Sequence, residues 1–178
     1  MPIQDDHFSL FGLPACFVAD ERALEEAYKR VQAHIHPDRF AAAPAAERRV
    51  AMQWAARANE AFQTLRSPLR RAAYLCELNG TPIDAESNTA MPGAFLAQQM
   101  RWREELDEAR ASTDKAQLQP LMEEADALRA ATLKQLEATL DEARDFQAAA
   151  ALVRQLMFIE KFGDELAALA ETTAAGAG

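Results

Sequence analysis

The 178-residue chain has little of what β-structure, disulfide scaffolds or membrane proteins require. It contains six glycines, two cysteines and 7% aromatic residues, and no alternating run of β-branched side chains. Cys16 and Cys76 lack C-x-x-C spacing, so we expect small buried thiols in a reducing compartment. No apolar run is long enough to cross a bilayer, and no signal peptide or basic presequence is evident. These absences predict an all-α, cytoplasmic protein.

Positive charge is also scarce in the second half of the chain. Residues 1–79 hold ten basic and ten acidic side chains, whereas residues 80–178 hold nine and eighteen, which accounts for the net charge of -9. Such a surface repels phosphate backbones and anionic lipids, so nucleic acid and membrane partners are not expected. His34 and His36 are two residues apart and do not share a helix face, so we expect no metal site, and no cofactor is expected either.

Helical periodicity dominates the first half. Apolar residues at i, i+3, i+4 and i+7 spacing predict helices over Asp20–Ile35 and about Ala46–Leu65, which should pack as an antiparallel hairpin. A short helix over Phe8–Phe11 precedes them. Ser67-Pro68 should cap a further helix that ends at Asn79-Gly80. We expect Trp54 to be a core residue of this unit and Val50 to share its packing face.

The second half is predicted to be a separate helical bundle. Residues 80–93 combine turn formers without any period, which indicates a linker. Three amphipathic stretches follow, at Ala94–Ala111, Asp114–Leu140 and Asp145–Leu169, and short connections make a three-helix bundle the economical arrangement. The predicted boundaries are therefore 1–79, 80–93 and 94–173, with a frayed tail at 174–178. The role of Trp102, between two arginines, is left open.

The tripeptide His36-Pro37-Asp38 is the most informative motif. Pro37 excludes His36 from the α region and ends the preceding helix, so an imidazole and a carboxylate should stand on an exposed corner. A basic patch is predicted beside them, comprising Lys29, Arg30 and Arg39, with Arg22 and His34 as further candidate members. The simplest alternative is a solvated corner without function. An enzyme that used His36 and Asp38 as acid and base would need further polar residues for a pocket, which the sequence lacks.

Leu96 and Met100 lie four residues apart, a spacing that usually indicates core. In this helix Phe95, Leu106 and neighbouring alanines already supply an apolar stripe, so Leu96 and Met100 are surplus to it. Phe158 likewise falls off the last helix's stripe, which consists of Leu152, Leu156 and Ile159. Apolar residues left over by the core are typical of a partner site.

Several of these segments resemble a known family. Tyr28-Lys29-Arg30, the tripeptide with Arg39-Phe40, and Ala58-Asn59-Glu60-Ala61-Phe62 are similar to helices II and III of a J-domain. The stretches 8–14, 64–68 and 103–108 also resemble the HscB family, the J-type co-chaperones of iron-sulfur cluster assembly. The resemblance runs nearly end to end.

The resemblance implies two binding sites and no catalysis by this chain. An N-terminal J-domain would engage a DnaK-type chaperone ATPase (HscA in bacteria) and stimulate it through His36, Pro37, Asp38, Arg39, Lys29 and Arg30. The bundle would hold an iron-sulfur scaffold protein (IscU) through Leu96, Ala97, Met100, Arg101, Glu104 and Phe158. The chain would then deliver the scaffold to the chaperone, and would be a monomer alone. The alternative is a general J-domain co-chaperone for unfolded clients, which the lack of a Gly/Phe-rich linker or cysteine-rich module disfavours.

Overall fold

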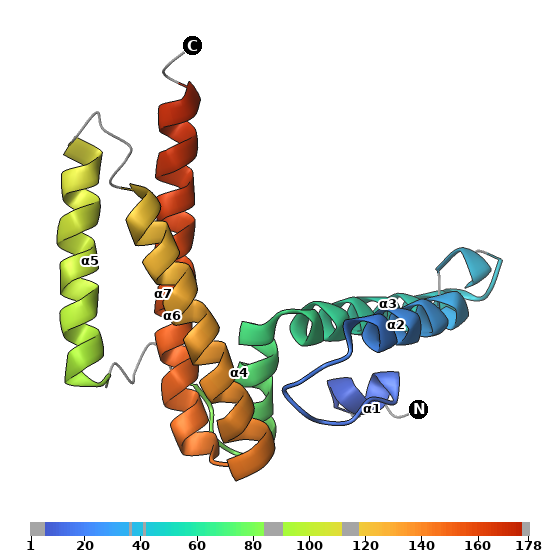
Figure 1. The fold of residues 1–178 in the computed structure, drawn as a ribbon. Helices are drawn as coiled ribbons and strands as arrows, with labels where there is room; N and C mark the ends of the chain where they lie inside the picture. The colour runs from blue at the N-terminus through green and yellow to red at the C-terminus, as the bar shows by residue number, and fades with distance from the viewer. Residues whose placement is uncertain (1–5, 36, 41, 84–90, 112–117, 176–178) are drawn as a thin grey trace.

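A computed structural model describes residues 6–35, 37–40, 42–83, 91–111 and 118–175 (Figure 1). These ranges contain no strand, which confirms the predicted all-α class. The elements are α1 (His7–Phe11), α2 (Glu21–Ile35), the 3₁₀ turn η1 (Pro37–Phe40), α3 (Ala45–Arg66), α4 (Pro68–Leu78), α5 (Gly93–Ala111), α6 (Leu118–Glu137), the π-helical turn η3 (Ala138–Ala143) and α7 (Phe146–Ala175).

The helices form an N-terminal unit (α1 to α4) and a bundle (α5 to α7). Figure 1 shows the antiparallel hairpin of α2 and α3 pointing away from the bundle, so the two units form the arms of an L. Helix α4 lies at the corner and packs along α7. The tip of the hairpin and the outer face of α5 are therefore far apart and separately accessible.

Local sequence explains where the N-terminal helices begin and end. The Asp6 carboxylate accepts hydrogen bonds from two backbone N–H groups in the first turn of α1, at 2.9 and 3.0 Å, and Gly12 ends this helix at φ 66°. Asp20 caps α2 in the same way. Ser67 caps α4, with Pro68 at the first helical position, where its missing N–H has no cost.

One hydrophobic core joins the two units. It includes α1 and the facing sides of α2, α3 and α4, and it continues into the ends of α6 and α7 that meet at η3. This core crosses the boundary predicted from the sequence, because α4 packs its apolar face against α7 as well as against the hairpin. Its members from α4 are Ala72, Leu75 and Cys76, and those from η3, α6 and α7 are Leu136, Leu140, Ala149, Ala150, Val153 and Leu156.

A second core holds α5 against the other halves of α6 and α7. Its centre is Trp102, which is fully buried and stacks on Phe162 with ring centroids 4.5 Å apart. Trp102, whose role the sequence leaves open, is therefore a core residue. The helix α7 is long enough to serve both cores, one with each half of its length.

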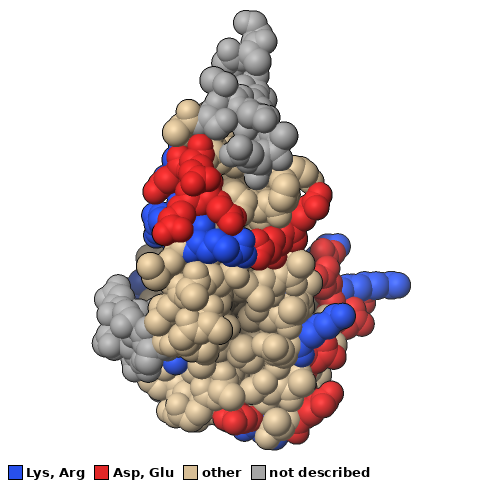
Figure 2. Space-filling model, turned by 60° about the vertical axis from the view of Figure 1, so that its left-hand side comes forward, with Lys and Arg blue, Asp and Glu red and all other residues tan. Residues whose placement is uncertain are grey.

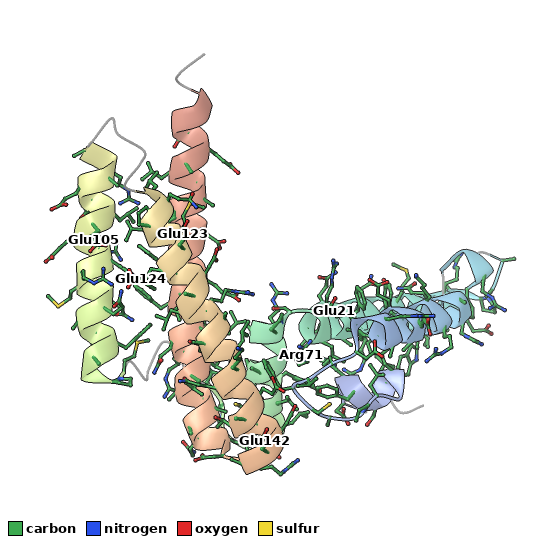
Figure 3. All side chains as sticks on the ribbon, in the orientation of Figure 1. Glu21, Arg71, Glu105, Glu123, Glu124 and Glu142 are labelled. Carbon is green, nitrogen blue, oxygen red and sulfur yellow. The ribbon has the colours of Figure 1, made fainter. Side chains whose placement is uncertain are left out.

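A polar junction fixes the corner of the L. The carboxylate of Asp141, in the π-helical turn η3, accepts hydrogen bonds from the backbone N–H groups of Phe17 (2.7 Å) and Val18 (2.9 Å). Arg71 of α4, labelled at the corner in Figure 3, donates from Nε to the Phe17 carbonyl (2.7 Å) and from Nη1 to the Leu65 carbonyl (2.5 Å). We call Asp141 and Arg71, with the loop that they bind, the junction.

Four details differ from the sequence-based expectations. Trp54, expected in the core, is only half-buried. Val50 is 45% exposed, because the core side of α3 runs through Ala51, and adjacent residues on a helix point about 100° apart. Cys16 is only half-buried, whereas Cys76 is buried as expected. Helix α7 continues to Ala175, into the stretch predicted to fray, since its alanines favour the helical state.

Candidate functional site

Pro37 and Asp38 of the predicted tripeptide lie at the tip of the hairpin, on the end away from the bundle (Figure 1). Helix α2 ends at Ile35, and Pro37–Phe40 form the 3₁₀ turn η1. The helix thus ends before His36, the residue that Pro37 disfavours from the α region. His36 lies outside the described residues, and only the backbone of Pro37 and Asp38 is described. The roles of these three side chains stay predictions.

The predicted basic residues lie along the last turns of α2 and on η1. Lys29 is 75% exposed, and its Nζ lies 4.0 Å from Glu25 Oε2, an exposed pair that contributes little to stability. Arg30 is exposed as well. Arg39 Nη1 donates to the Ala33 carbonyl at 2.5 Å, which satisfies a backbone acceptor in the last turn of α2. The structure therefore places Lys29, Arg30 and Arg39 at the same end of the hairpin as the tripeptide.

The second predicted site lies on the outer face of α5. Leu96 is 43% exposed and Met100 is 66% exposed, although the opposite face of the helix is buried through Phe95, Trp102 and Leu106. Since α5 already buries a full apolar face, the side chains of Leu96 and Met100 are left in solvent. They form an apolar spot that the protein's own core does not use.

The remaining predicted residues of this site differ in environment. Ala97 and Glu104 are exposed on α5 beside the apolar spot. Phe158 of α7 is half-buried, with its ring edge-on to Phe95 at 5.8 Å and parallel to Trp102 at 6.4 Å. Phe158 therefore belongs partly to the second core, and only part of its ring is available to a partner.

Arg101 is engaged within the bundle. Its guanidinium forms ion pairs with Glu105 on the next turn of α5 (2.9 Å) and with Glu124 of α6. Glu124 also accepts hydrogen bonds from Trp102 Nε1 (3.1 Å) and Gln98 Nε2 (3.2 Å). Figure 3 labels both glutamates, which come from neighbouring helices. The positive charge of Arg101 is therefore neutralised locally.

This network sets the charge state of Glu124. Burial raises the pKa of its carboxyl, but hydrogen bonds from Arg101, Trp102 and Gln98 outweigh burial, so the pKa lies below its usual value. Glu124 is thus held as a carboxylate that joins α5 to α6 beside the apolar spot. Figure 2 shows charged side chains as a band across this face of the bundle, with a broad surface of uncharged residues below it.

Sequence reasoning missed two residues in this region. Met157 is 41% exposed on α7, and it could have been noticed because it directly follows Leu156 on the apolar stripe and so points elsewhere. Glu124 carries no recognisable sequence signal, because its partner Trp102 is 22 residues away on another helix.

The described residues contain no group of three or more His, Cys, Asp or Glu side chains that could hold a metal ion. Among the helices that the structure describes, none has the length and apolarity that crossing a bilayer requires.

Comparison with known proteins gives consistent relatives over nearly the whole chain. The chain is 57% identical to the "Co-chaperone protein HscB homolog" of Bordetella petrii over 164 residues, which is 92% of this chain and 95% of that protein. It is 53% identical to the protein of the same name from Burkholderia thailandensis over 169 residues, 95% and 96% of the two chains. A family described as "HSCB C-terminal oligomerisation domain" matches residues 91–167.

Solved structures show the same architecture. Chaperone HscB from Vibrio cholerae superposes with a TM-score of 0.81 at 36% identity, covering 95% of this chain and 99% of that one. Human co-chaperone protein HscB has a TM-score of 0.87 at 23% identity, covering 93% and 82%, which is a likeness of fold. These matches confirm the predicted fold, an N-terminal J-domain followed by a C-terminal helical bundle.

Proposed function

Because the chain belongs to the HscB family of co-chaperones, we propose that it delivers an iron-sulfur scaffold protein of the IscU type to a DnaK-type chaperone of the HscA type and stimulates that chaperone's ATPase. In this proposal the chain performs no covalent chemistry. It binds one partner with each arm of the L, and the chaperone carries out the hydrolysis.

The observation that carries the scaffold-binding half is the exposure of Leu96 and Met100 on a helix that already has a buried face. A partner that covers these side chains removes apolar surface from water, at about 25 cal/mol per Å². Glu104 and Ala97 border the spot, and Phe158 adds a ring edge. Arg101 has a supporting role, since its charge is already neutralised by Glu105 and Glu124.

The chaperone-binding half rests on position and charge. The backbone of Pro37 and Asp38 follows α2 at the tip of the hairpin, and Lys29, Arg30 and Arg39 lie on the same end of the hairpin. A carboxylate such as that of Asp38 can pair with an arginine of the chaperone, and charge-assisted bonds of that kind are the strong ones. The basic residues would speed association with an acidic chaperone surface, and this effect falls with salt.

The shared core and the junction connect the unit that carries one proposed site to the unit that carries the other. Helix α4 packs on α7 and Asp141 binds the loop of the J-domain, so the two proposed sites lie on units that share a core. A scaffold bound to α5 is thereby presented to the chaperone at a raised local concentration.

The test combines purified chaperone and scaffold with four forms of this protein: wild type, Asp38→Asn, the double variant Leu96→Ala/Met100→Ala, and the control Met52→Ala. Met52 is 63% exposed on α3, so the control removes a comparable exposed side chain at neither site. We expect Asp38→Asn to abolish ATPase stimulation while still binding scaffold. The double variant should bind scaffold at least tenfold more weakly, a loss of about 1.4 kcal/mol or more, and should keep stimulation by the J-domain alone.

The proposal fails if Asp38→Asn stimulates like wild type, or if the double variant binds scaffold normally. Melting curves accompany each variant. A large loss of stability in the double variant would assign Leu96 and Met100 to the core instead. The predicted monomeric state is measured on the same samples by sedimentation.

A further inference from the structure

A second apolar surface lies on the J-domain, away from α5. It is a groove of about 610 Å³ between α1, α2 and α3. Buried Leu10 and Phe11 line it from α1, and half-buried Val31, Ile35 and Trp54 line it from α2 and α3. The volume lies within the range of sites that bind ligands or short peptide segments. Neither site of the proposed function uses this apolar lining.

The shape of the groove fits a short segment of polypeptide. Along α2 it extends from Ala27 to Ile35, eight residues apart, which corresponds to about 12 Å at 1.5 Å per residue. That length accommodates roughly two turns of helix, enough for anchoring side chains at i, i+3 or i+4 and i+7. The groove is open to solvent because Val31, Ile35 and Trp54 are only half-buried.

The guanidinium of Arg30 places a positive charge at the edge of the groove. Arg30 and His34 both line the groove and are exposed, and His34 Nδ1 lies 2.7 Å from the Arg30 carbonyl oxygen. Two of the three acidic residues of α2 pair with other side chains, Glu25 with Lys29 and Glu26 with Arg22, and the third, Glu21, lies in the first turn and does not line the groove. Within the described part of the chain, Arg30 forms no ion pair, and none of the described residues that line the groove is acidic. Among the described residues that line the groove, none supplies a counter-charge to Arg30.

We propose that this groove binds an amphipathic acidic segment of a partner protein, with apolar side chains over Phe11, Val31 and Trp54 and a carboxylate at Arg30. The apolar lining supplies the affinity, and the cationic edge selects acidic over basic segments. The proposal shares Arg30 with the predicted chaperone-binding residues, but its apolar lining belongs to neither site of the proposed function, and the contact does not require Asp38.

The full-length chain offers a direct fluorescence assay. Trp54 lines the groove, whereas Trp102, the other tryptophan, is fully buried in the second core. The probes are two synthetic peptides of roughly twelve residues with leucines at i, i+3, i+4 and i+7 spacing, one with glutamates and the other with lysines between them. We expect saturable changes in Trp54 emission with the glutamate peptide, an affinity at least tenfold above that of the lysine peptide, and weakening with added salt.

Three variants separate the contributions. Val31→Phe fills the groove and should weaken the glutamate peptide at least tenfold, while Val50→Phe, the same exchange at an exposed position of α3, should leave it unchanged. Arg30→Glu, at an exposed position, should reverse the preference between the two peptides, and it tests the edge even if Val31→Phe loses stability. Asp38→Asn should bind the peptide normally, so this result is independent of chaperone stimulation.

Equal affinity for both peptides would overturn the proposal, as would a lack of saturable binding at millimolar peptide. It would also be overturned if sedimentation showed a dimer that Val31→Phe dissociates, because the groove would then be covered by a second copy of the chain.

Discussion

Replacing Asp141 tests whether the two arms of the L are held by the junction. Its two carboxylate oxygens accept the N–H groups of Phe17 at 2.7 Å and Val18 at 2.9 Å. Hydrogen bonds to a charged group contribute about 1.5–3 kcal/mol each, with less expected for Val18, which is 55% exposed. In Asp141→Ala the N–H of buried Phe17 loses its acceptor, so we expect a loss of roughly 2–4 kcal/mol.

That loss has two measurable consequences. A domain of this size loses about 2–4 °C of melting temperature per kcal/mol, so the midpoint should fall by roughly 5–15 °C. The Phe17 amide should exchange with solvent at least roughly thirtyfold faster, since each 1.4 kcal/mol corresponds to a factor of ten. The matched control is Glu142→Ala, the next residue, whose exposed carboxylate is labelled in Figure 3 and should change neither measurement.

If Asp141→Ala melts within a degree of wild type with unchanged Phe17 exchange, the corner is held by the shared apolar core alone. The role assigned to the Asp141 carboxylate would then be wrong. Arg71 cannot replace the lost acceptor, because its guanidinium only donates hydrogen bonds and contacts the carbonyl of Phe17, not its N–H.

Two further predictions concern buried polar groups. Glu124→Leu should destabilise the bundle by about 1–3 kcal/mol in urea titrations, because it leaves the buried indole N–H of Trp102 without an acceptor. Glu124→Gln keeps an acceptor oxygen and should lose less stability. Equal losses in the two variants would contradict this role for Glu124. Burial lowers the pKa of His7, with Arg57 adding to the effect, and its ring stacks on Tyr74 at 4.3 Å. The unfolded chain therefore takes up the proton first, so stability is full above the unfolded pKa of about 6.5 and is lost as pH falls below it; melting from pH 8 to 5 should show this loss in wild type and not in His7→Phe.

Much of the fold could be predicted from local chemistry. The caps at Asp20 and Ser67, the glycine after α1 and the proline after Ile35 define helix ends through interactions within a few residues, so the sequence shows them directly. Apolar periodicity likewise identified the buried faces of most helices. The surplus character of Leu96 and Met100 followed from counting how many apolar residues one face of α5 needs.

Other features could not be predicted, because they join residues that are distant in sequence. Phe17 and Asp141 are 124 residues apart, and no local pattern links a loop N–H to a carboxylate on a π-helical turn. Trp102 was ambiguous between two arginines until the position of Phe162 and Glu124 was known. The partial burial of Phe158 depends on the same packing.

The sequence by itself therefore determined the helices, their buried faces and the candidate partner residues, since these depend on short-range periodicity, capping and composition. Only the tertiary structure decided that α4 and α7 share a core, that Asp141 joins the two units, and that α1, α2 and α3 leave a groove with a cationic edge. Those features arise from packing between segments that are distant in sequence. No local pattern links such segments, so the features exist only once the chain has folded.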